Sequence, residues 1–148
     1  MPQTNTISLI SYDEAQAALA AAVAFAHEQG LSLSFVILDG AGHLVTCARM
    51  DGAPFVTIEV ARGKAFACIA TGGQKGRQLR ERYLEHPMVW GNIPSLGYGA
   101  PLLPAIGSEP IWRDGKLIGA MGASGGSADI DEEALKVAIE AIGATITP

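Results

Sequence analysis

Hydrophobic positions near the start of the chain follow a helical spacing that begins at a recognisable cap. Ser11 and Glu14 form a capping box, in which each side chain accepts a hydrogen bond from a backbone amide near the start of the helix. The apolar stripe that follows recurs every three or four residues and predicts a helix from about Tyr12 to Gln29. Gly30 is suited to the position just after its last turn.

After this helix, apolar and polar residues begin to alternate along the chain. Residues 31–38 alternate at first, become wholly apolar and predict a strand. Asp39-Gly40 favours a tight turn, and the residues after it predict a return strand. Asp114-Gly115 lies between two further apolar segments and predicts a second hairpin.

Helical spacing returns in residues 55–71, and Pro54 is suited to the start of that helix. Gly63 lies inside it, where a glycine costs about 1 kcal/mol relative to alanine. We therefore expect another backbone to pack closely there. A short polar helix is predicted at residues 74–86, and the Gly- and Pro-rich residues 88–110 predict a long loop.

A last helix is predicted from the acidic start at residues 129–132 to about Gly143. The complete order predicts an α/β (α+β) fold, in which helices cover an antiparallel sheet of four or five strands. The chain has 148 residues, of which 49% are hydrophobic and 17% charged. We expect a single domain over residues 1–148 with a sizeable core.

The charge balance excludes some classes of partner. The formal net charge is −5, which disfavours general nucleic-acid binding.

The first residues lack the basic start and apolar run of a signal peptide, and no apolar stretch is long enough to span a bilayer. We therefore expect a soluble, cytoplasmic protein with no nucleic-acid or membrane partner.

Two smaller features have an ordinary and a functional interpretation. A basic run is expected to form a solvated face, with an acidic partner or a second subunit as the alternative. It comprises Lys75, Arg77, Arg80 and Arg82. Cys47 and Cys68 lack the spacing of a metal pair and are expected to be reduced packing residues, with a redox role as the alternative.

Three segments together resemble the GlcG/HbpS family, also described as the haem-degrading domain or DUF336. They are LDGAGHLVTCARMDGAPFVTIEVARGKA, WRDGKLIGAMGASGG and DIDEEA, in that order. The family includes haem-binding and haem-degrading proteins, glycolate-operon proteins and the C-terminal domain of some corrinoid adenosyltransferases. The resemblance implies a profilin-like three-layer α/β/α sandwich with a five-stranded antiparallel sheet, and a homo-oligomer.

The resemblance also bears on single residues. Some family members have a first-helix histidine similar in position to His27, which makes His27 a candidate ligand of haem iron. Glu109 stands where the family usually has glycine, so the rim of the site departs from the family pattern. His43 is expected to be solvated, and His86 lies in an aromatic cluster that either covers a flat ligand or forms a small surface core.

The segment Arg49-Met50-Asp51-Gly52 either merely ends a strand in a turn or also lines a pocket. In a pocket, the Arg49 guanidinium would bind a carboxylate such as a haem propionate. Lys64 lies about 200° around its helix from Arg62, so one of the two is expected to face the protein.

The segment Gly122-Ala123-Ser124-Gly125-Gly126 either forms a flexible turn or presents backbone amides to an anion. We expect one pocket between the first two helices and the sheet edge, with haem or another tetrapyrrole as ligand and otherwise no cofactor. Its candidate binding residues, besides His27 as the metal ligand, are Arg49, Met50, Gly52, Arg62, Gly122, Ser124 and Gly125.

Two alternatives come from other classes of protein. One is a cofactor-free isomerase, hydrolase or decarboxylase that acts on a small organic acid or ring-derived carboxylate. In it Asp51 would be the catalytic acid/base, and Lys64 or Arg49 would hold the carboxylate. The other is a purely structural oligomer without a ligand.

Overall fold

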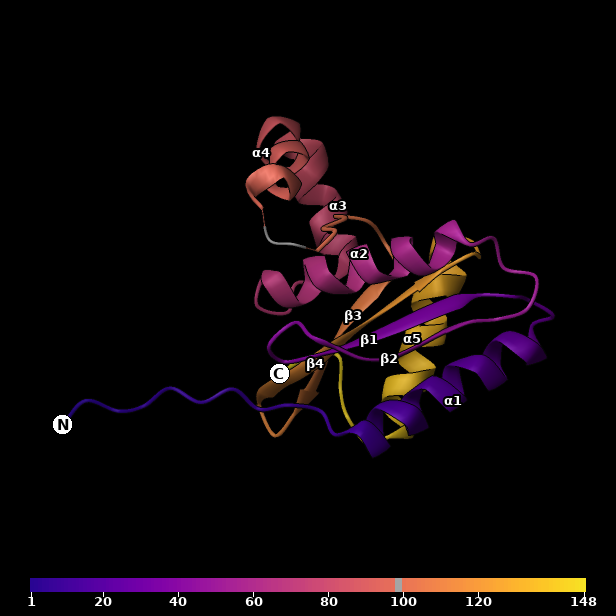
Figure 1. Cartoon of the computed structure of the whole chain (residues 1–148), viewed down its shortest axis with the longest axis horizontal. Helices are drawn as coiled ribbons and strands as arrows, with labels where there is room; N and C mark the ends of the chain where they lie inside the picture. Colours follow the sequence, from indigo (N-terminus) through magenta and orange to yellow (C-terminus); the bar gives the residue numbers. More distant parts are fainter. Residues whose placement is uncertain (98–99) are drawn as a thin grey trace.

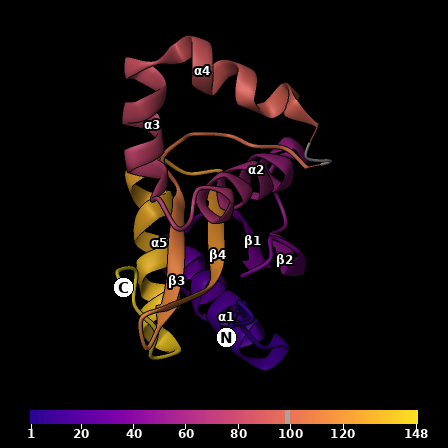
Figure 2. The ribbon, with the colours of Figure 1, turned by 90° about the vertical axis from the view of Figure 1, so that its left-hand side faces the viewer.

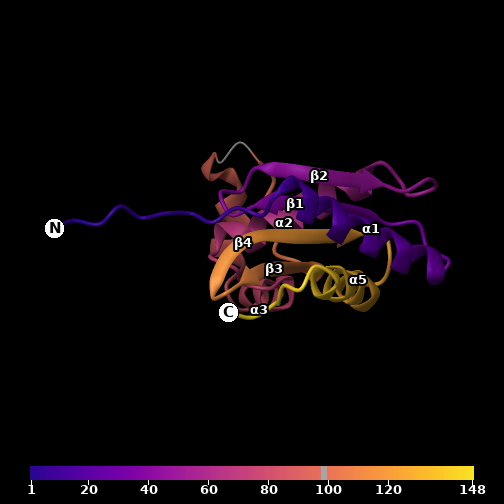
Figure 3. The ribbon, with the colours of Figure 1, turned by 90° about the horizontal axis from the view of Figure 1, so that it is seen from below.

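The computed structural model describes residues 1–97 and 100–148. Within those residues the sheet has four antiparallel strands in the order β2-β1-β4-β3, an order that Figure 3 shows. The strands are β1 (Ser34–Asp39), β2 (Leu44–Arg49), β3 (Ser108–Arg113) and β4 (Lys116–Ser124). Both predicted hairpins are present, β1 with β2 and β3 with β4.

Helices cover both faces of the sheet (Figure 1). The helices α1 (Tyr12–Glu28) and α5 (Ala128–Ala141) pack on one face, and α2 (Val56–Ala70) packs on the other. Beyond α2, the helices α3 (Gly76–Glu85) and α4 (Pro87–Asn92) project as an arm, followed by a short 3-10 helix, η1 (Ile93–Leu96) (Figure 2). None of the described helices is long and apolar enough to cross a membrane.

Local signals in the sequence account for the helix ends and the turns. The capping box of α1 is confirmed: the Glu14 amide donates to Ser11 Oγ at 3.2 Å and the Ser11 amide to Glu14 Oε2 at 3.4 Å. In the β3–β4 turn, Asp114 and Gly115 have φ values of 51° and 73°. This left-handed conformation is the one that a two-residue hairpin turn requires.

The prediction of a five-stranded sheet is wrong: among the described residues the sheet has four strands. Along the outer edge of β3, Thr145 is the one residue of the described chain that pairs with the strand. The Trp112 amide donates to the Thr145 carbonyl at 2.8 Å, and the Thr145 amide donates to the Trp112 carbonyl at 2.9 Å. One bridge residue is too little extended chain for a fifth strand.

The long loop predicted at residues 88–110 is partly wrong as well, because α4 and η1 occupy its first part. Proline stands in the first turn of both, where its fixed φ favours a helix start. Residues 98–99 of that stretch lie outside the described residues.

Small residues bring the layers close together. The faces of α1 and α5 toward the core are rich in fully buried alanine, as in Ala18 and Ala138. On the other face, a Cβ added at Gly122 of β4 would lie 2.1 Å from the Ala61 carbonyl oxygen of α2. The close packing predicted at Gly63 is confirmed, because the Leu103 amide donates to the Gly63 carbonyl at 3.0 Å.

Candidate functional site

The structure divides the predicted site residues between separate hollows. Lys64 and Ser124 line one hollow, whereas His27 lines another, together with the Arg49–Asp51 segment. Arg62 borders a third hollow, beside His43. The expectation of one common cavity is therefore not met within a single copy of the described chain.

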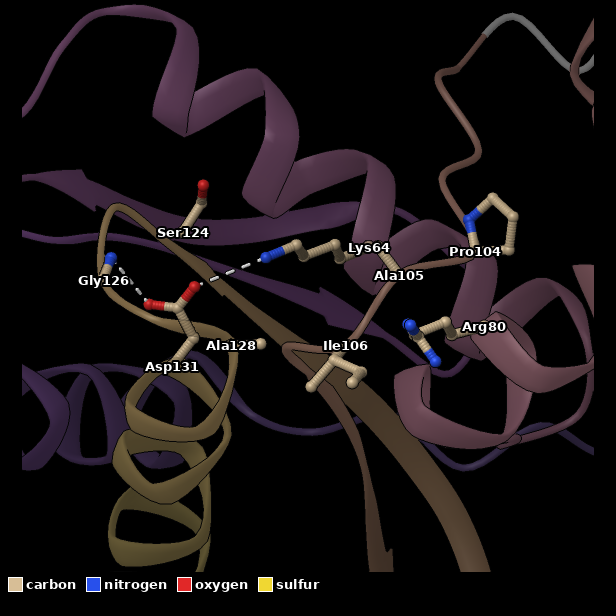
Figure 4. A pocket seen from close by; sticks show the side chains of 9 residues that line it. All are labelled: Lys64, Arg80, Pro104, Ala105, Ile106, Ser124, Gly126, Ala128 and Asp131. Atoms are coloured by element: carbon tan, nitrogen blue, oxygen red, sulfur yellow. Dashed lines mark hydrogen bonds and ion pairs between the residues drawn. The ribbon is translucent and has the colours of Figure 1, made fainter. Parts of the chain in front are cut away.

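The Lys64 hollow lies at the end of β4, where α2, α3 and the start of α5 meet (Figure 4). Its volume is about 340 Å³. The loop before β3 forms one wall. The lining residues are Lys64, Arg80, Pro104, Ala105, Ile106, Ser124, Gly126, Ala128 and Asp131.

A buried ion pair forms the polar end of this hollow. Lys64 Nζ donates to the Ala123 carbonyl at 2.9 Å and lies 3.4 Å from Asp131 Oδ2. The other carboxylate oxygen of Asp131 accepts the Gly126 amide at 3.0 Å. The two side chains are only 8% and 3% exposed.

Burial is the main cause of the pKa shifts of Lys64 and Asp131. It lowers the pKa of Lys64 and raises the pKa of Asp131, and in each case the charge of the partner opposes the shift without cancelling it. The two pKa values are therefore closer together than in water. Transfer of a proton from Lys64 to Asp131 therefore costs less free energy than between the same two groups in water.

Arg80 enters the hollow from α3, on the side opposite Asp131 (Figure 4). Its one recorded contact among the described residues is with the exposed Glu81, at 3.1 Å from Nη1. The Ser124 hydroxyl has no recorded hydrogen-bond partner in the described part of the chain. Arg80 and the Ser124 hydroxyl therefore have hydrogen-bonding capacity that a bound molecule could use.

The His27 hollow lies where the last turn of α1 faces the end of β2. It also has a volume of about 340 Å³, and it is lined by Val23, His27, Ser32, Ala48, Arg49, Met50 and Asp51. His27 is exposed, and no contact of its imidazole is recorded among the residues that the structure describes. Arg49 donates from Nη1 to the Ala53 carbonyl at 2.8 Å, and Met50 Sδ accepts the Leu33 amide at 3.4 Å.

Residues 10–140 match the model of the family described as "Haem degrading protein HbpS-like". The chain belongs to this HbpS-like family. It is 31% identical over 121 residues to the protein GlcG of Escherichia coli (strain K12), which covers 81% of this chain and 84% of that protein. It is 29% identical over 142 residues to the corrinoid adenosyltransferase PduO of Citrobacter freundii, which covers 90% of this chain but 39% of that longer protein.

A solved structure agrees with this membership. The crystal structure of the PduOC:haem complex is similar with a TM-score of 0.83 and 27% identity, over 95% of this chain and 99% of that chain. The haem in that structure is bound by the relative. This likeness is a reason to ask which residues of this HbpS-like chain could bind haem.

The His27 hollow fits haem by the chemistry of its residues. Among the described residues, no group of three or more His, Cys, Asp or Glu side chains could hold a metal ion. Haem iron needs only one or two protein ligands, because the macrocycle supplies four nitrogens. In the described part of the chain, His27 could supply one such ligand, beside apolar side chains and Arg49.

The three glycines predicted to bind a ligand have another role. Gly122 lies beneath α2 in the contact described above, so it cannot line a cavity. Gly125 has a φ of 117° and lies against the Leu33 backbone, where it lets the chain turn after β4. Gly52, with a φ of 90°, serves the turn after β2.

The sequence analysis did not predict the two charged lining residues Asp131 and Arg80, nor the role of Gly107 next to the Lys64 hollow. Asp131 had a signal: it shares the apolar stripe of α5 with Leu135 and Ala138, and a carboxylate in such a stripe is expected to be buried with a partner. Arg80 resembled any other member of the basic run. At Gly107, a Cβ would lie 2.7 Å from Lys64 Nζ, and only the three-dimensional packing reveals this.

The basic run is not simply a solvated face. Arg77 donates to Asp129 at 2.8 Å and to Glu132 at 3.1 Å, which ties α3 to α5. The Arg82 guanidinium lies 4.5 Å from the centre of the Trp90 ring. Of the two cysteines, Cys68 is buried as expected of a packing residue, whereas Cys47 is exposed on the edge strand.

Glu109 is the most unusual charged residue outside the two hollows. It is 1% exposed, and its Oε2 has no hydrogen-bond partner among the described residues. Burial raises its pKa to about 7, against the opposing charge of Lys75.

Proposed function

We propose that this chain binds haem or a closely related tetrapyrrole at the His27 hollow, with the His27 imidazole as a ligand of the iron. The observation that carries the proposal is the exposed His27 ring, which has no recorded partner among the described residues and lines a hollow together with Arg49. The likeness to a haem-bound relative supports it.

Four further lining residues have chemistry that suits this ligand. Val23, Ala48 and Met50 offer apolar surface to a flat ring. Arg49 uses Nη1 for the Ala53 carbonyl, and its other guanidinium donors are available for a propionate carboxylate.

The size of the hollow suggests how much of the ligand is enclosed. About 340 Å³ is near the lower end of the range for small-molecule sites, so one copy would cover only part of a tetrapyrrole. A second copy of the chain across the open side would cover the rest. We therefore expect a homo-oligomer, which sedimentation velocity with and without haem would test.

The test is a haem titration followed by Soret absorbance. We expect saturable binding to the wild-type protein. His27→Ala should weaken binding about tenfold or more and change the Soret position, because the iron loses its protein ligand. His43→Ala is the matched control and should bind as the wild type does. Equal binding and an equal spectrum in His27→Ala would remove this residue from the proposal.

Arg49 has a separate test. Arg49→Gln should weaken the binding of haem but not of its dimethyl ester, because only the free propionates accept hydrogen bonds as anions. If the variant weakens both ligands equally, Arg49 contributes packing and not propionate recognition.

The enzyme alternative is reduced to one of its two versions. Asp51 and Lys64 line different hollows, which leaves no support for Lys64 as the carboxylate anchor, whereas Asp51 and Arg49 line the same hollow. Activity lost in Asp51→Asn, in a variant that still folds, would favour this remaining version.

A further inference from the structure

We propose that the Lys64 hollow is a second binding site, which takes a small organic anion with a single carboxylate. The proposal does not rest on haem binding, because the two hollows share no lining residue. Four observations lead to it: an available arginine, a buried polar end, an apolar middle and a wall held in place by glycines.

Arg80 provides the anchor for the carboxylate. It reaches into the hollow from α3, and among the described residues only its Nη1 is engaged, by Glu81. The remaining donors, Nε and Nη2, form the fork that binds a carboxylate through two parallel hydrogen bonds. The Arg80–Glu81 pair is exposed and between adjacent residues, so a ligand can displace it at little cost.

The opposite end of the hollow selects against a second carboxylate. Asp131 lies there and balances the charge of the Lys64 ammonium, so this end offers no unpaired positive charge to a second carboxylate. Lys64 has three ammonium donors, of which the structure records two in use. The Ser124 hydroxyl is also available, so a neutral oxygen on the ligand would find donors at this end.

The lining between the two ends is apolar. Pro104, Ala105, Ile106 and Ala128 contribute it, as Figure 4 shows. A bare phosphate or sulfate ion would leave this surface unused, whereas a short hydrocarbon body would cover it and gain from leaving water. The lining therefore favours an organic carboxylate over an inorganic anion.

Two glycines hold the wall in position. Added Cβ atoms would lie 2.7 Å from Lys64 Nζ at Gly107 and 2.2 Å from the Ala105 carbonyl at Gly76. A side chain at Gly76 would push the loop before β3 away from α3, and one at Gly107 would displace the Lys64 ammonium from its place in the hollow. The packing of this loop thus sets the shape of the hollow.

The experiment is a set of ¹H–¹⁵N correlation spectra titrated with butyrate, succinate or inorganic phosphate. Butyrate and succinate have the same number of carbon atoms and differ in the second carboxylate. We expect butyrate to give saturable shifts at the amides of Ala105, Ile106, Gly126 and Ala128. Succinate and phosphate should bind at least about tenfold more weakly.

Variants make the assignment specific. Arg80→Gln should weaken butyrate binding about tenfold or more while the fold stays intact, because Arg80 is exposed and makes only a surface pair. Lys116→Gln removes the same charge from the distant β3–β4 turn and should bind as the wild type does. Arg80→Gln should also bind haem as the wild type does, so a failure of either site is distinguishable from a failure of the other.

Three results would overturn the proposal. They are no saturable shift with butyrate, unchanged butyrate binding in Arg80→Gln, and binding of phosphate as tight as that of butyrate. The last would mean that the hollow selects for charge alone.

Discussion

Lys64 and Asp131 come from helices on opposite faces of the sheet, yet Nζ and Oδ2 approach to 3.4 Å past the end of β4. The pair connects α2 with α5 directly. Nζ also binds the Ala123 carbonyl of β4, so all three layers are joined at this point. The same contact forms one end of the hollow that we assign to a small carboxylate.

Breaking this pair should be costly. Lys64→Met leaves Asp131 buried without a cation, which we expect to lower the free energy of unfolding by about 3 kcal/mol or more. Urea denaturation at neutral pH measures it. The control is Lys136→Met, which removes the partly exposed pair with Glu132 at 3.3 Å and should change stability by about 1 kcal/mol or less.

A double variant separates the interaction between Lys64 and Asp131 from the cost of each single substitution. Lys64→Met with Asp131→Asn should be less destabilised than the sum of the two single variants, because neither buried charge is left alone. Simple additivity would show that the two groups do not stabilise one another.

The buried Glu109 carboxyl should make stability depend on pH. Its folded pKa of about 7 lies above its ordinary value of 4.5, so the folded state retains a proton that the unfolded chain has lost. Stability from this group is complete below about pH 4.5 and decreases as the pH rises to about 7. The charged groups around it are Lys75, Arg77, Glu132 and Lys136.

Glu109→Gln removes this titration while keeping the shape of the protonated form. Above about pH 7 the variant should be more stable than the wild type by up to about 3 kcal/mol, and below about pH 4.5 the two should be nearly equal. Urea unfolding across this range is the measurement. A stability difference that does not vary with pH would mean that Glu109 does not titrate between these limits.

Gly122 should tolerate no side chain. In Gly122→Ala the new methyl group would meet the backbone of α2 at Ala61, so the helix must move, and we expect a loss of at least about 2 kcal/mol. Gly91→Ala is the matched control, since its Cβ would meet only the Tyr83 ring at 3.8 Å. Equal thermal unfolding of these two variants would contradict the packing described here.

The elements with local signals could be predicted from the sequence. The capping box predicted the start of α1, and the Asp-Gly pair at residues 114–115 predicted the second hairpin. Gly63 predicted that another backbone segment packs closely against α2. The helical position of Lys64 relative to Arg62 indicated that one of them faces the protein, and Lys64 is the buried one.

The arrangement of the candidate site could not be predicted in this way. Arg49 and Lys64 are only fifteen positions apart in sequence, but the α2 helix directs Lys64 toward α5 while Arg49 folds back onto its own turn at Ala53. The partner of Lys64, Asp131, comes from a segment distant in sequence. Such contacts depend on how the layers stack, which local spacing does not specify.

The location of the bound tetrapyrrole tests the central claim most directly. Gallium(III) protoporphyrin is a diamagnetic substitute for haem, so ¹H–¹⁵N correlation spectra can map its site residue by residue. We predict that the largest shifts occur at Val23, His27, Ser32 and Arg49, with little change at Ile106 and Gly126. Shifts concentrated at Ile106 and Gly126, with His27 unmoved, would contradict the assignment of the tetrapyrrole to the His27 hollow.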